Sequence, residues 1–62
     1  MGDNTVTIVF RGNVQPAILN NVKSIDIKKD VVVVTGYGYR QVYFKDVIQS
    51  LNADYSVGVF IK

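Results

Sequence analysis

Three tyrosines and one arginine lie within residues 37–43, and they are the side chains of this sequence best suited to recognition. Aromatic rings stack on nucleic-acid bases, while a neighbouring cation binds phosphate. Tyrosine and arginine are also enriched at the centres of protein interfaces, because each offers a large contact area with a polar end. We therefore predict that Tyr37, Tyr39, Arg40 and Tyr43 form the main exposed recognition patch. Its partner is either another protein or single-stranded nucleic acid.

Catalysis and metal binding find little support in the residue types. The sequence has no Cys, no His and no Glu, which excludes thiolate and imidazole ligands, disulfides, and Cys or His nucleophiles. Its Asp residues do not follow the spacing of a calcium-binding loop. The segment Gly36-Tyr37-Gly38 lacks the third glycine and the following helix of a dinucleotide-binding loop. We expect a protein that is not an enzyme and that uses no metal or cofactor.

The composition predicts an all-β fold in a single small domain, residues 1–62. Twelve Val and six Ile favour strands, whereas two Leu and two Ala leave few strong helix formers. A chain of this length must bury a dense apolar core, associate with another subunit, or do both.

Alternation of polar and apolar residues places the strands. The predicted strands occupy residues 5–11, 24–28, 31–34, 39–44 and 57–61. Residues 14–21 contain Pro16, which cannot donate to a strand ladder, so we expect an edge strand or an irregular return there. Val22 and Ile25 are three positions apart, so in a regular strand their side chains would point to opposite faces. Bringing both to one face predicts a β-bulge near Lys23. The strands should form an antiparallel meander of five or six members, folded as a barrel or a sandwich.

Residues 39–44 have one face with Tyr39 and Tyr43 and an opposite face with Val42 and Phe44. We expect the second face in the core and the tyrosines outside.

In the segment 46–52 the spacing of the apolar residues changes from that of a strand to that of a helix. Asp46 can cap a helix, Gln49 can complete a capping box, and apolar residues recur at helical spacing. One short helix is predicted here, and a strand is the alternative.

The run Val31, Val32, Val33 and Val34 is apolar on both faces of its strand. A sheet in so short a chain has one core side, so the second face needs cover from elsewhere. Closed two-fold dimers are the commonest assembly. We therefore predict a homodimer with 31–34 at the shared surface, with a closed barrel or a covering helix as the alternative.

Two spaced patterns carry a resemblance to a known class of proteins. The first is Val22-x-x-Ile25-x-Ile27-x-x-Asp30-x-Val32-x-Val34, and the second is Tyr43-Phe44-x-x-Asp46-Val47-Ile48-x-Ser50-Leu51. Together they cover about half the chain, and their cadence resembles short, uncharacterised β-rich proteins of phages and prophages of Gram-positive bacteria. The resemblance implies a compact accessory protein of the host cytoplasm, often oligomeric. It implies no catalytic or binding residue.

The expected function is therefore a non-enzymatic protein-interaction or structural accessory module that associates with itself and with an unidentified protein. The alternative is a small β-barrel that binds single-stranded nucleic acid through Tyr, Arg and Lys. No run approaches the roughly 18 apolar residues of a membrane span, and no signal peptide is evident, so we expect a cytoplasmic protein with no membrane contact.

Overall fold

The computed structural model describes residues 4–54 and 56–61 and folds them largely as β-strands. The elements are β1 (Val6–Phe10), β2 (Ala17–Leu19), β3 (Val22–Ile27), β4 (Val31–Gly36), β5 (Arg40–Phe44), a 3₁₀ turn η1 (Lys45–Val47), β6 (Ile48–Ala53) and β7 (Gly58–Ile61). The prediction of an all-β chain is confirmed, but the described residues hold seven strands rather than five or six.

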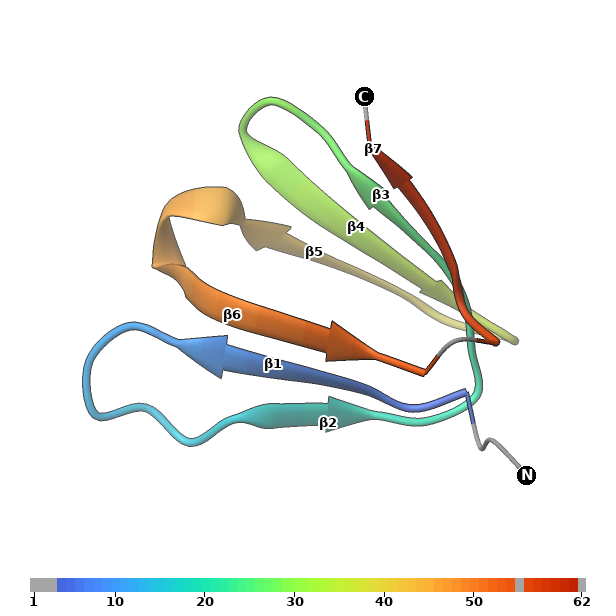
Figure 1. Cartoon of the computed structure of the whole chain (residues 1–62), viewed down its shortest axis with the longest axis horizontal. Helices are drawn as coiled ribbons and strands as arrows, with labels where there is room; N and C mark the ends of the chain where they lie inside the picture. The colour runs from blue at the N-terminus through green and yellow to red at the C-terminus, as the bar shows by residue number, and fades with distance from the viewer. Residues whose placement is uncertain (1–3, 55, 62) are drawn as a thin grey trace.

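The strands form two sheets (Figure 1). One has the order β2-β1-β6 and is antiparallel, with the short β2, after Pro16, at its edge. The other has the order β5-β4-β3-β7, in which β7 runs parallel to β3. The predicted antiparallel meander is wrong in two respects: β7 is parallel to β3, and the consecutive pairs β2–β3 and β5–β6 are divided between the two sheets. The chain leaves the second sheet at η1, follows β1 as β6, and then crosses back to the free edge of β3. Such a crossover is what parallel pairing requires.

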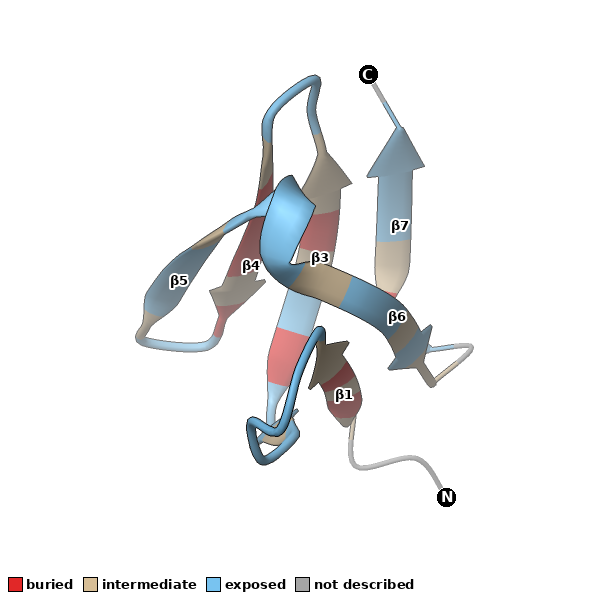
Figure 2. Cartoon of the chain, turned by 90° about the vertical axis from the view of Figure 1, so that its left-hand side faces the viewer, coloured by how far each residue is buried: buried red, intermediate tan, exposed pale blue. Residues whose placement is uncertain are grey.

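The helix predicted at 46–52 is wrong, and its strand alternative is close to the observed structure. Helical geometry is limited to the single turn Lys45–Val47, whose first residue follows Phe44 without a side-chain cap. β6 begins at Ile48 and pairs with β1, with Ile8 opposite Leu51. Figure 2 shows the curl of η1 leading directly into β6. The edge of β1 offers a ladder of long-range hydrogen bonds that outweighs the local helical signal.

Both sheets contribute to one core of aliphatic side chains (Figure 2). Its buried members are Val6, Ile8, Val22, Ile25, Val32, Val34 and Val57. The predicted bulge near Lys23 is confirmed by a shift of the β3–β4 register between Val22 and Ser24. An extra residue at this position lets Val22 and Ile25 face the same core despite their opposite parity. No polar side chain is buried among the residues that the structure describes.

Candidate recognition surface on the four-stranded sheet

The two faces of the four-stranded sheet follow from its register. Val34 pairs with Ile25 and Val32 with Ile27, and Val32, Val34 and Ile25 belong to the core. Paired residues share a face, and successive residues alternate between faces. The intervening positions therefore point away from the core and make up what we call the outer face. Its apolar members are Val31, Val33, Val42, Phe44 and Phe60, and its charged members are Asp26 and Arg40.

The predicted orientation of β5 is wrong. Val42 and Phe44, expected in the core, are 58% and 72% exposed and lie on the outer face. Tyr39 and Tyr43, expected outside, are half-buried and pack against the core. A tyrosine ring suits the rim of a small core, because its apolar body is buried while its hydroxyl stays within reach of water or an acceptor.

Tyr43 packs beside Phe10 of β1, which ties the edge of one sheet to the other. The centroids of the two rings lie 5.7 Å apart with their planes tilted by 48°. This is a favourable separation for an aromatic pair. A ring held between two sheets is poorly placed to stack on a nucleic-acid base.

Tyr39 lies across Gly36, at the turn between β4 and β5. A Cβ atom added at Gly36 would lie 2.2 Å from two carbon atoms of the Tyr39 ring, so the glycine makes room for the ring. The Tyr39 hydroxyl donates a hydrogen bond to the carbonyl oxygen of Asn20. These contacts join the β4–β5 turn to the end of β2, which is a structural role.

The other two residues of the predicted patch are exposed. Tyr37 lies in the β4–β5 turn, where its backbone N–H donates to the carbonyl oxygen of Asn21 at 3.0 Å. Arg40 begins β5 and shares the outer face with Val42 and Phe44. The four predicted residues are therefore divided, two against the core and two at the surface.

The Val31–Val34 run is also divided between the faces. Val32 and Val34 belong to the core, and Val31 is half-buried on the outer face. Val33 points away from the core yet is only 4% exposed. Since the core lies on the other side of the sheet, Val33 must be covered by side chains of its own face. The run itself therefore leaves no valine fully uncovered.

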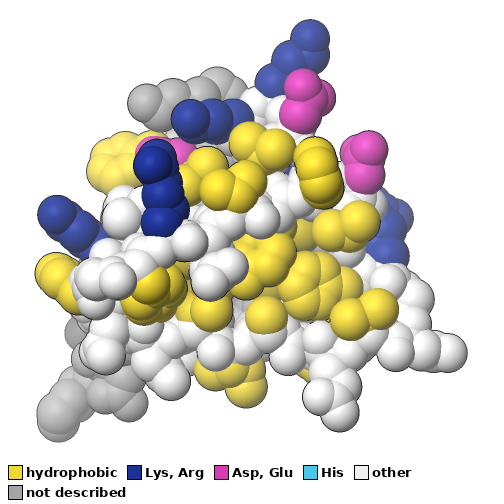
Figure 3. All heavy atoms as spheres, turned by 180° about the vertical axis from the view of Figure 1, so that it is seen from behind, with side chains coloured by type: hydrophobic (Ala, Val, Ile, Leu, Met, Phe, Trp, Pro, Cys, Tyr) yellow, Lys and Arg dark blue, Asp and Glu magenta, His cyan; other side chains and the backbone are white. Residues whose placement is uncertain are grey.

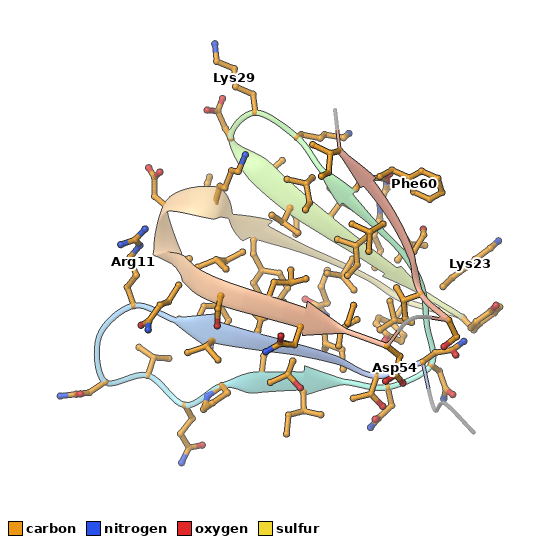
Figure 4. All side chains as sticks on the ribbon, in the orientation of Figure 1. Arg11, Lys23, Lys29, Asp54 and Phe60 are labelled. Atoms are coloured by element: carbon orange, nitrogen blue, oxygen red, sulfur yellow. The ribbon has the colours of Figure 1, made fainter. Side chains whose placement is uncertain are left out.

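Sequence reasoning missed the large apolar side chains that the outer face exposes, namely Val42 and Phe44 on β5 and Phe60 on β7. Arg40 is the sequence signal that could have identified the exposure of Val42 and Phe44. The three residues alternate along one strand and therefore share a face, and a charged side chain favours the solvent-exposed face. Figure 4 shows Phe60 pointing away from the interior, on the side where Lys23 also extends. Figure 3 views the molecule from behind, which is the side on which β5 lies in Figure 2. It shows hydrophobic side chains gathered over the middle of the molecule.

Acidic side chains do not converge on a cation site in the described residues, where no three of them lie together. No helix within 4–54 and 56–61 has the length and apolar character needed to cross a membrane. Side-chain hydrogen bonds within the described residues join segments that are far apart in the chain. Asp54, for example, accepts a hydrogen bond from the backbone N–H of Thr5 at 3.0 Å through Oδ2.

Comparison with protein-family models, with curated proteins and with solved structures finds no match to this chain.

Proposed function

We propose that this protein is a non-enzymatic interaction module that associates with a second copy of itself through the outer face of the β5-β4-β3-β7 sheet. The observation that carries the proposal is the exposure of Val42 and Phe44 beside the covered Val33, with Phe60 exposed on the same face beyond Asp26. Val42, Val33 and Phe44 lie on neighbouring strands, and exposed apolar side chains that lie together mark interaction surfaces more often than scattered ones do.

The energetic reason lies in the size of these side chains. A phenylalanine buries roughly 150–250 Å² when covered, so covering the exposed part of Phe44 removes on the order of 140 Å² from water. At about 25 cal/mol per Å², this contributes about 3.5 kcal/mol per subunit before the cost of association. Phe60, 53% exposed, adds a comparable area.

Charge on the same face is compatible with self-pairing. Arg40 on β5 and Asp26 on β3 share the outer face with the apolar residues. A two-fold axis places each surface against its own copy, so residues of opposite charge from the two subunits can meet. Such pairs at a rim select the register more than they add affinity.

Binding of single-stranded nucleic acid is the weaker alternative. It needs several rings free to stack, and of the three tyrosines in question Tyr39 and Tyr43 pack against the core while Tyr37 is exposed. A gel shift with a single-stranded oligonucleotide tests it, because electrostatic binding must weaken steeply as salt rises. We expect no shift at low salt.

Equilibrium sedimentation tests self-association. We expect twice the chain mass of 6.9 kDa at micromolar concentration. Phe44→Ser should raise the dissociation constant at least about 100-fold, since tenfold corresponds to about 1.4 kcal/mol. Ile18→Ser is the matched control, because Ile18 is similarly exposed but lies on β2 of the other sheet. A single-chain mass for the unaltered protein, or equal effects of both variants, would refute the proposal.

A further inference from the structure

The outer face carries two opposite charges on strands that are not neighbours. Arg40 is exposed on β5, Asp26 is half-buried on β3, and β4 lies between these strands. Arg40 pairs with Thr35 and Asp26 with Val33, so the two charges are also offset by two residues along the strands. With neighbouring strands about 4.8 Å apart and about 3.4 Å of rise per residue, their Cα atoms are about 12 Å apart. The register therefore does not set the two charges side by side within one subunit.

Apolar side chains flank Asp26 on both neighbouring strands. Its register partners are Val33 on β4 and Phe60 on β7. Val33 is 4% exposed, and the Phe60 ring leans along its own strand, because a Cβ atom added at Gly58 would lie 3.1 Å from it. A carboxylate in these surroundings loses part of its hydration when the face is covered, so the covering surface must bring a cation or hydrogen-bond donors. This requirement restricts how two copies can pair.

The position of the two-fold axis decides which charges meet. An axis that runs along β5 places Arg40 against the partner's Arg40, and an axis along β3 places Asp26 against the partner's Asp26. An axis across the strands leaves β5 over β5 and β3 over β3, so the opposite charges stay about 10 Å apart. An axis along β4 exchanges β5 and β3 and avoids both like-charge contacts.

We infer that Arg40 of each subunit binds Asp26 of the other across a two-fold axis that runs along β4, an inference that rests on the outer-face dimer proposed above. The remaining offset along the strands is about 7 Å, which the long arginine side chain spans. The guanidinium then lies beside the Phe60 ring, where a cation–π contact is favourable. The valines of β4 lie at the axis with Phe44 beside them, so the same arrangement covers the apolar surface.

Reversing the charges tests the pair. Arg40→Asp leaves two carboxylates at the paired positions, and Asp26→Arg leaves two guanidinium groups. Each variant alone should raise the dissociation constant of the dimer at least about 100-fold, because like charges then meet at both symmetric contacts. An equimolar mixture of the two variants should form a heterodimer about as tight as the unaltered dimer, since both opposite-charge pairs are restored. The doubly reversed chain should dimerise with itself for the same reason.

Equilibrium sedimentation measures the dissociation constants, and native mass spectrometry identifies the heterodimer. Lys29→Asp and Asp30→Arg are the matched controls. They change the net charge by the same amounts at exposed positions between β3 and β4, where Figure 4 shows Lys29 extending outward, and they should leave the dimer unchanged.

The outcomes separate this pair from the dimer itself. If the unaltered chain is a dimer and the single reversals do not weaken it, the pair is wrong and the outer-face dimer stands. The same holds if neither the mixture nor the doubly reversed chain dimerises. Controls that dissociate the dimer as strongly as the reversals would also overturn the inference, because net charge would then explain the effect. A single-chain mass for the unaltered protein removes the dimer and the pair together.

Discussion

Gly36→Ala should destabilise the fold through Tyr39. The φ angle of Gly36 is not positive, so the glycine is required for space rather than for backbone freedom. A Cβ atom 2.2 Å from two ring carbons is far inside van der Waals contact, so the ring must leave its place. The hydrogen bond from the Tyr39 hydroxyl to Asn20 is then lost together with the packing of the ring on the core.

The expected loss is about 2 kcal/mol. The hydrogen bond contributes about 1 kcal/mol. A half-buried ring of roughly 200 Å² contributes about 2 kcal/mol more. Alanine lowers the conformational entropy of the unfolded chain, which offsets up to about 1 kcal/mol of this loss of stability. A domain of this size has about 3–9 kcal/mol of stability, so a loss of about 2 kcal/mol lowers Tm by roughly 10 °C.

Urea denaturation measures the effect, and a double-mutant cycle assigns its cause. In a Tyr39→Ala background, Gly36→Ala should cost less than about 0.5 kcal/mol, because no ring remains to be displaced. Gly12→Ala is the matched control: Gly12 has φ +85° and no atom within 4 Å of an added Cβ, so its penalty should be equal in both backgrounds. If Gly36→Ala costs the same with and without the tyrosine ring, the reasoning is refuted.

Three further stability predictions follow from burial and backbone geometry, all measured by urea denaturation. Ile25→Ala should lower the free energy of unfolding by about 2–5 kcal/mol because Ile25 is fully buried. Ile61→Ala should lower it by under about 0.5 kcal/mol because Ile61 is exposed. Similar losses for the two variants would contradict the assigned core. Asn21 has φ +57°, so Asn21→Ala should lower the free energy of unfolding by about 1 kcal/mol, whereas Asn21→Gly should change it little. A larger loss for glycine than for alanine would exclude a left-handed residue there. Asp54→Ala should cost about 1–2 kcal/mol by removing the acceptor of the Thr5 N–H, and an unchanged midpoint would show that this contact contributes nothing.

The sequence alone identified the β-rich class and several individual strands. β1, β3 and β4 are recognisable because β-branched residues alternate with polar ones or run together between turn signals. The bulge near Lys23 was also readable, because a change of parity within a strand needs an extra residue. These features depend on neighbours along the chain, and local spacing records them directly.

The inward face of β5 and the pairing of β6 and β7 were decided only by the tertiary structure. Both faces of β5 carry large side chains, so alternation alone does not say whether Tyr43 or Phe44 meets the other sheet. Ile48–Ala53 has a helical spacing that yields to the long-range ladder with β1. β7 has a strand pattern that cannot say which edge it joins or in which direction. Each outcome depends on contacts between residues far apart in the chain, because burial is settled by what another sheet covers and not by the pattern of the strand itself.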